Sequence, residues 1–94
     1  MTDVGKSPTL TLESVWPQPA NPQAEVRYSV TEPGTVEIQL YNLQGSLLYS
    51  GENFADAPGS YSLMLDTAQY PSGQYFLRME SAGSVVQQIL TILK

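Results

Sequence analysis

The chain contains neither cysteine nor histidine among its 94 residues. Without cysteine there is no disulfide, no thiolate nucleophile and no cysteine ligand for a metal ion. Without histidine the chain also lacks the usual general base at neutral pH, the commonest zinc ligand and any Ser-His-Asp triad. We therefore predict a protein that is not an enzyme and that holds neither a cofactor nor a metal ion.

Basic residues are also scarce: four lysine and arginine residues stand against nine acidic residues, and the net charge is −5. The four are scattered along the chain at Lys6, Arg27, Arg78 and Lys94. A protein that follows nucleic acid needs clustered basic side chains to displace counterions from the phosphates. A polybasic lipid-binding patch needs the same clustering. The charge distribution therefore excludes nucleic acid as a partner.

Long apolar runs are missing as well. No stretch approaches the ~20 apolar residues of a membrane-spanning helix, so we expect no transmembrane segment. Residues 1–8 lack the apolar centre of a secretory signal peptide and are interpreted as linker or expression-vector residues. Hydrophobic residues nevertheless make up 41% of the chain and charged residues only 14%, which favours a folded core over disorder. We expect one domain over residues 9–94.

Apolar and polar residues alternate along most of the chain, which is the pattern of strands with one buried face. Turn-forming residues separate the alternating segments. Short strands at this spacing predict an all-β fold, an immunoglobulin-like antiparallel β-sandwich of about seven strands. The apolar positions that mark the expected strands are Leu10, Leu12 and Val15; Val26, Tyr28 and Val30; Val36, Ile38 and Leu40; 47–49; Tyr61, Leu63 and Leu65; Tyr75, Leu77 and Met79; and 85–93.

Two parts of this pattern need a structure to resolve them. After the short fourth strand, residues 51–59 are interpreted as a long acidic connection. The last strand has apolar residues on both of its faces, so either face can be the buried one. The two sets are Val86, Leu90 and Ile92 on one face, and Val85, Ile89 and Leu93 on the other.

Several turns contain residues that determine their conformation. Residues 42–45 (Asn-Leu-Gln-Gly) suit a hairpin in which Gly45 has a positive φ angle. Residues 71–75 (Pro-Ser-Gly-Gln-Tyr) place Tyr75 directly after a turn, as in a tyrosine corner, so we expect its hydroxyl to bond a nearby backbone group. Prolines at three positions within 17–22 cannot donate backbone hydrogen bonds. This stretch should therefore cross between the sheets or follow the edge of one.

Three motifs follow one another in order: Trp16-Pro17-Gln18-Pro19-Ala20-Asn21-Pro22, then Tyr41-Asn42-Leu43-Gln44-Gly45, then Ser72-Gly73-Gln74-Tyr75. With a final strand that ends at Lys94, they resemble the type A C-terminal sorting domain of proteins exported by the type IX (Por) secretion system of Bacteroidetes-like bacteria. The resemblance covers residues 15–94. The residues that match family motifs, mainly in structural roles, are Trp16, Pro17, Pro19, Asn21, Pro22, Tyr41, Gly45, Ser72, Gly73 and Tyr75.

This resemblance implies a non-catalytic domain that directs an N-terminally fused cargo protein through the type IX system. The implied partners are the outer-membrane machinery of that system and the cargo. The implied destination is the cell surface or the medium, by way of the periplasm and the outer membrane. We expect the machinery to read the strand end, Ile92, Leu93 and Lys94, by edge pairing or docking. Lys94 can equally be a solvated terminal charge.

The chain departs from the family pattern at two places. Gln18 stands where asparagine is usual, and the last strand has Gln87 and Gln88 where further basic residues are common. The same sandwich and motifs also resemble the immunoglobulin-like domain of flagellar hook-capping proteins, in which the domain serves assembly. Because sandwiches support many functions, the fold alone does not decide between these two families.

A structural or carbohydrate-binding module of a secreted enzyme is the other alternative. Trp16 and Phe54, which we expect in exposed loops, are the aromatic residues that could stack on a sugar. The tyrosines at 28, 61 and 75 lie on the apolar faces and are expected in the core. Glu52, Asn53 and Asp56 carry oxygen ligands of the kind that calcium prefers, but they lack the density of a dedicated calcium loop.

Overall fold

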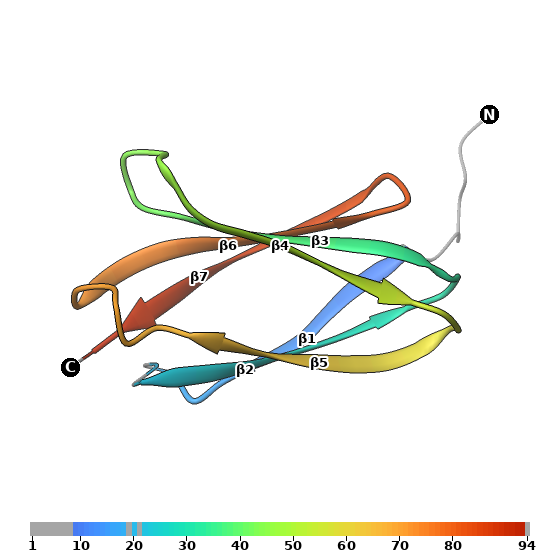
Figure 1. Ribbon diagram of the computed structural model, residues 1–94, viewed down its shortest axis with the longest axis horizontal. Helices are drawn as coiled ribbons and strands as arrows, with labels where there is room; N and C mark the ends of the chain where they lie inside the picture. Colours follow the sequence, from blue (N-terminus) through green and yellow to red (C-terminus); the bar gives the residue numbers. More distant parts are fainter. Residues whose placement is uncertain (1–8, 19, 21, 94) are drawn as a thin grey trace.

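Two antiparallel sheets pack face to face in the computed structural model, which describes residues 9–18, 20 and 22–93 (Figure 1). The three-stranded sheet has the order β1-β2-β5 and the four-stranded sheet has the order β4-β3-β6-β7. Within the described residues there is no helix. The expected immunoglobulin-like sandwich is confirmed. Its strands are β1 (Leu10–Trp16), β2 (Gln23–Val30), β3 (Gly34–Tyr41), β4 (Leu47–Ala55), β5 (Gly59–Asp66), β6 (Gly73–Ser81) and β7 (Ser84–Ile92).

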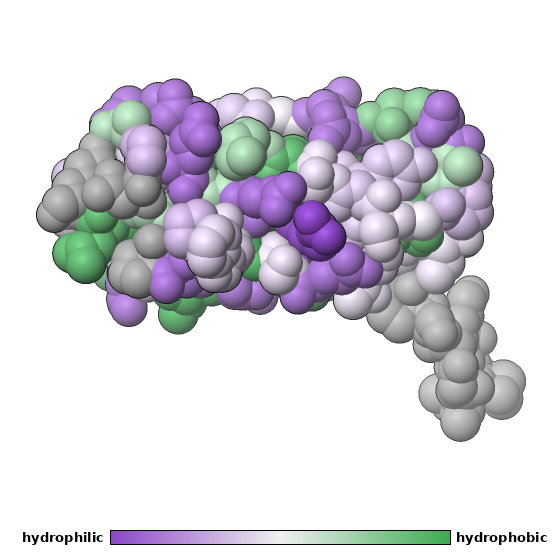
Figure 2. All heavy atoms as spheres, turned by 90° about the horizontal axis from the view of Figure 1, so that it is seen from below, coloured by the Kyte–Doolittle hydropathy of each residue, from purple (hydrophilic) through white to green (hydrophobic). Residues whose placement is uncertain are grey.

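The core lies between the two sheets and is built by the alternating strands. In β2, Val26 and Tyr28 are fully buried, whereas Arg27 between them is exposed. In the four-stranded sheet, buried residues of neighbouring strands lie opposite one another. Ile38 of β3, for example, pairs with Met79 of β6. The outer face of the three-stranded sheet is mostly hydrophilic, and its hydrophobic residues form separate small patches (Figure 2). Burial on one face and hydration on the other explain the period-two pattern.

The fourth strand is longer than the sequence predicted. β4 combines the expected short strand at 47–49 with the first part of the expected connection at 51–59, so that interpretation was wrong. β4 lies at the edge of its sheet and pairs with β3 from Tyr41 opposite Leu47 to Gly34 opposite Ala55. Most of its side chains are exposed. Because backbone pairing and not burial defines this strand, its sequence shows no alternation.

The structure also decides which face of β7 is buried. Val86 pairs with the buried Met79 and Leu90 pairs with the buried Tyr75, so these side chains point between the sheets. Val85 and Ile89 lie on the opposite face and are exposed. A shift of one residue would exchange the two faces, and the pairing with β6 excludes it.

The turn between β3 and β4 has the conformation that its residues predict. Gly45 has a φ of 88°, which confirms the expected positive angle. The Asn42 side chain organises the turn, because its Oδ1 accepts hydrogen bonds from the backbone amides of Gln44 (3.0 Å) and Ser46 (2.9 Å). Such side-chain-to-backbone bonds are the reason asparagine is common in turns.

Replacement of Gly45 by valine should lower the free energy of unfolding by about 1–2 kcal/mol, because a residue with a Cβ atom is strained at positive φ. No atom lies within 4 Å of the position that a Cβ would take at Gly45, so steric overlap adds nothing. Urea denaturation measures the change. Gly45→Asn is the matched control and should lose less, since asparagine tolerates this conformation. Equal midpoints for Gly45→Val and the parent would contradict the prediction.

Candidate functional site

The three motifs, far apart in the sequence, come together at one end of the sandwich (Figure 1). Gly73 pairs with Ile92 across β6 and β7, and Ala20 forms a parallel bridge with the same Ile92. Tyr41 pairs with Phe76 and leads into the β3–β4 turn. We call this region the motif end and define it as residues 18, 20, 41–48, 70–75 and 90–93. The described chain also stops there.

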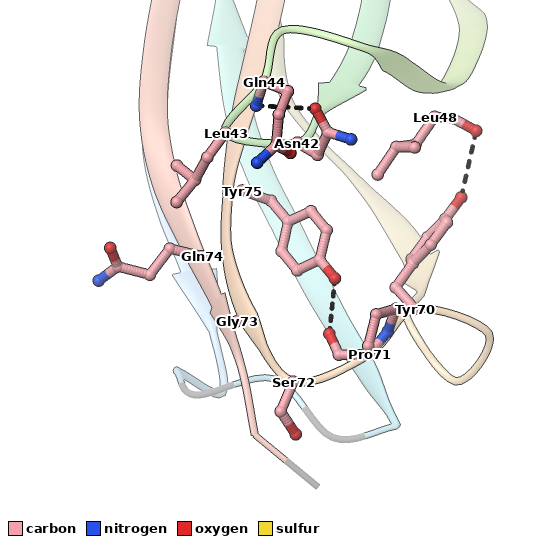
Figure 3. Close-up of a pocket in the computed structure, with 10 residues that line it drawn as sticks. All are labelled: Asn42, Leu43, Gln44, Leu48, Tyr70, Pro71, Ser72, Gly73, Gln74 and Tyr75. Carbon is pink, nitrogen blue, oxygen red and sulfur yellow. Dashed lines mark hydrogen bonds between the residues drawn. The ribbon is translucent and has the colours of Figure 1, made fainter.

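Two of the motifs line a pocket of about 380 Å³ at the motif end (Figure 3). The β3–β4 turn forms one wall and the connection from β5 to β6 forms the other. Half of the lining residues are leucine, tyrosine or proline, and the pocket therefore favours a ligand with an apolar group. Its lining residues are Asn42, Leu43, Gln44, Leu48, Tyr70, Pro71, Ser72, Gly73, Gln74 and Tyr75.

Tyr75 fastens the connection between β5 and β6. Its ring is buried, and its hydroxyl donates a hydrogen bond of 2.6 Å to the carbonyl oxygen of Pro71 (Figure 3). The ring also lies 6.0 Å from that of Tyr70, centroid to centroid. Tyr70 in turn donates to the Leu48 carbonyl at 3.4 Å, which links this connection to β4. The expected tyrosine corner is confirmed, and it positions Ser72 and Gly73 on the pocket wall.

Removal of the Tyr75 hydroxyl in Tyr75→Phe should cost roughly 1 kcal/mol of stability, the value of one hydrogen bond. Tyr75→Ala should cost ~3–5 kcal/mol because it also removes a large buried ring. Chemical denaturation of both variants gives the two values. The control is Tyr41→Phe, because that hydroxyl bonds only the half-buried Gln39 side chain at 3.2 Å and should matter less. A Tyr75→Ala variant as stable as the parent would show that the corner is not needed.

The proline-rich segment follows the outer edge of β7. The Gln18 side chain donates from Nε2 to the Ile89 carbonyl (3.1 Å) and accepts at Oε1 from the Thr91 amide (2.9 Å). Ala20 then donates to the Thr91 carbonyl (2.8 Å) and accepts from the Leu93 amide (3.2 Å). The amide group of Gln18 thus takes the place of a strand backbone. Pro19 and Asn21 lie outside the described residues.

Beyond Ala20 the chain crosses to the three-stranded sheet. The Pro22 carbonyl accepts two hydrogen bonds from the fully buried Thr67, one from its amide (2.8 Å) and one from its Oγ1 (2.7 Å). The segment therefore does both things that its prolines allow: it follows one edge and it crosses between sheets. No sequence pattern indicated Thr67 as the partner of this segment. Gln18 was visible only as a departure from the family pattern.

The role of Gln18 has a direct test in hydrogen exchange. In Gln18→Ala the Thr91 amide loses its acceptor. The free energy that protects this amide should fall by about 1 kcal/mol, and its exchange rate should rise roughly five-fold. Gln87→Ala on the same strand is the matched control, since the structure describes no side-chain bond for Gln87. Two-dimensional NMR follows the amides individually. Unchanged exchange at Thr91 in Gln18→Ala would mean that the bond does not form in solution.

The aromatic and acidic candidates lie apart from one another. Trp16 (72% exposed) and Phe54 (68%) are exposed as expected, but they belong to β1 and β4 and not to loops. Tyr28 is buried, and its hydroxyl accepts a hydrogen bond of 3.1 Å from Asn53. Glu52 pairs with Glu37 on the opposite face of β4, so Glu52 and Asn53 do not converge. Among the described residues no group of three acidic side chains could hold a metal ion.

The strand end divides into a buried and an exposed part. Ile92 is buried beneath Ala20, whereas Leu93 is 58% exposed. Lys94, the third residue that we expected the machinery to read, lies outside the described residues.

No helix in the described part of the chain is long and apolar enough to span a membrane.

Comparison with known protein families gives one match. The family described as "Secretion system C-terminal sorting domain" matches residues 14–92, which include all seven strands except the start of β1. No curated protein matches the sequence.

Proposed function

Because the chain belongs to the family of secretion system C-terminal sorting domains, we propose that its motif end is the surface that the secretion machinery recognises. A domain of this family is the sorting signal for type IX secretion and directs export to the cell surface or the medium. Sorting domains of this family are not catalytic. Membership of the family implies that the domain contacts the type IX machinery and a cargo region. The family match favours export over the two alternative roles, flagellar assembly and carbohydrate binding.

The gathering of the motifs is the observation that carries the proposal. The sandwich has a second end, where residues 31–33, 56–58 and 82–83 connect the strands. Those connections need turn residues as well, yet none of the three motifs lies there. The reversal of direction from strand to strand puts the β1–β2, β3–β4 and β5–β6 connections at one end, and the motifs lie in or beside these three and not in the other three. A shared partner surface accounts for it, since residues that bind one partner must be adjacent in space.

Exposed apolar side chains at the motif end support the same conclusion. Leu43, Leu47 and Leu93 are each more than half exposed, although the core has no need of them there. Leu43 lies on the rim of the pocket beside Gln74, which pairs with Thr91 of β7 (Figure 3). An exposed apolar side chain on the rim of a pocket with apolar walls favours an interaction site. The machinery therefore contacts the β3–β4 turn and the end of β7 together.

The strand end contributes in two ways. Leu93 follows directly after β7, donates its amide to the Ala20 carbonyl and supplies an exposed apolar side chain. Lys94, the next residue in the sequence, supplies a basic group in this proposal. Ile92 anchors them, because its burial and its bridge to Ala20 set the direction in which the chain leaves the sandwich. All three expected residues thus belong to the proposed signal, with Ile92 acting through packing.

A folded periplasmic reporter fused ahead of residues 9–94, in a bacterium with type IX secretion, tests this assignment. Leu43→Ser, Leu93→Ser and Lys94→Ala should each reduce the reporter at the surface or in the medium, without lowering the melting temperature. Phe54→Ser is the matched control: it removes an equally exposed apolar side chain near the opposite end, where Phe54 pairs with Thr35. Normal export of the motif-end variants, with loss of export in Phe54→Ser, would refute the proposal.

A further inference from the structure

A second pocket, of about 360 Å³, lies on the outer face of the three-stranded sheet and is lined by Trp16, Pro17, Pro22, Gln23, Glu25 and Met64. Strand register explains how it forms. Trp16 of β1 pairs with Glu25 of β2, which pairs with Met64 of β5, so the three side chains form one row across the sheet. Trp16 and Met64 are both more than half exposed. We call this the Trp16 pocket.

The walls of the Trp16 pocket are held in place by the backbone. Pro22 is fixed by its two hydrogen bonds from the buried Thr67, and Trp16 and Glu25 are fixed by the pairing of β1 with β2. The backbone positions of these residues are therefore set before a ligand arrives, so little backbone ordering entropy is lost on binding. The groups that a ligand would meet are one indole, two proline rings, a thioether and a carboxylate.

This combination suits a long side chain that ends in a positive charge. The face of an indole ring attracts cations more strongly than any other side-chain ring. Met64 and Pro22 offer apolar surface to the methylene groups of lysine or arginine, which lie along such surface while the charged head stays hydrated. The carboxylate of Glu25 lies in the same row and is the counter-charge.

The charges around the pocket also favour a cation. Glu25 has a neighbour in Arg27, but their closest distance is 3.6 Å and both side chains are substantially exposed, so this ion pair is weak. Asp66, which pairs with the pocket residue Gln23, adds a second carboxylate on the same sheet face. Its Oδ1 accepts a hydrogen bond of 3.0 Å from the Ala68 amide. Two carboxylates against one guanidinium leave this face negative, as is the whole chain.

We propose that the Trp16 pocket binds a lysine or arginine side chain presented by a protein partner. The site lies on the sheet face and not at the pocket of the β3–β4 turn, so it does not depend on the recognition surface proposed above. A neutral sugar fits it less well, because among the described lining residues only Gln23, Glu25 and the indole N–H of Trp16 offer polar groups. Sugar sites use several convergent polar groups in addition to an aromatic ring.

The single tryptophan of the chain makes the proposal measurable in the purified protein, since Trp16 is the only source of indole fluorescence. The probes are the capped tripeptides Ac-Gly-Lys-Gly-NH2 and Ac-Gly-Arg-Gly-NH2 at low ionic strength. Ac-Gly-norleucine-Gly-NH2 is the neutral counterpart of the lysine probe, and methyl β-glucoside represents a sugar. We expect a saturable change in Trp16 emission with the lysine and arginine probes, and a clearly weaker response to the other two.

Substitutions then separate local contact from general charge attraction. Glu25→Gln should weaken the lysine response about two- to five-fold, the range for one exposed ion pair. Glu52→Gln removes the same charge from the other sheet and should leave the response unchanged. Met64→Ala, at an exposed position, should weaken both the lysine and the norleucine probes. Each variant is first checked to have the same melting temperature as the parent. NMR shifts of the Trp16 indole provide a second readout.

Three results would overturn the proposal. Equal responses to norleucine and lysine would show an unselective apolar pocket. Equal losses in Glu25→Gln and Glu52→Gln would show general attraction by the net charge. A saturable response to the glucoside without one to lysine would assign the pocket to carbohydrate. None of these results bears on the export test, because that test changes residues at the motif end.

Discussion

The end of β7 is hydrogen-bonded along both of its edges. The arrangement of the motif end depends on these two sets of bonds. β6 pairs with one edge in the normal ladder, and the other edge bonds to Gln18 and Ala20. An uncovered strand edge invites pairing with other chains. Here the chain covers part of that edge itself, with a side-chain amide where prolines have removed backbone donors. The same bonds bring the first motif to the end of the last strand.

The other two motifs meet there because two local devices hold their loops. Asn42 bonds within the β3–β4 turn, and Tyr75 bonds across the connection into β6. The Asn42 Oδ1 and the Tyr75 hydroxyl are both taken up by these bonds. Their effect is to place ordinary residues, such as Leu43 and Gln74, where a partner can touch them. These motif residues therefore act mostly as scaffold, and in our proposal the contact surface is formed by residues beside them.

The two proposed surfaces differ in chemistry as well as in position. The motif end presents leucines around an apolar pocket, whereas the Trp16 pocket presents an indole beside carboxylates. They share the proline-rich segment, since Gln18 and Ala20 belong to one and Pro17 and Pro22 to the other. Bonds from this segment to β7 and to Thr67 fix both surfaces relative to the core. The sandwich can in this way offer two separate contacts to larger partners.

The sequence by itself determined the fold class, the alternating strands, the positive φ of Gly45 and the bond of Tyr75. Each of these depends on neighbours within a few residues or on burial of one strand face, which a linear pattern records. The tertiary structure alone decided the length of β4, because an exposed edge strand needs no apolar alternation. It also decided the buried face of β7, where both faces are apolar. Finally, it decided the roles of Gln18 and Trp16, whose partners are distant in the chain: Gln18 bonds Ile89 and Thr91, and Trp16 shares a row with Met64. Side-chain bonds of that range leave no periodic trace, so only the folded arrangement of the strands reveals them.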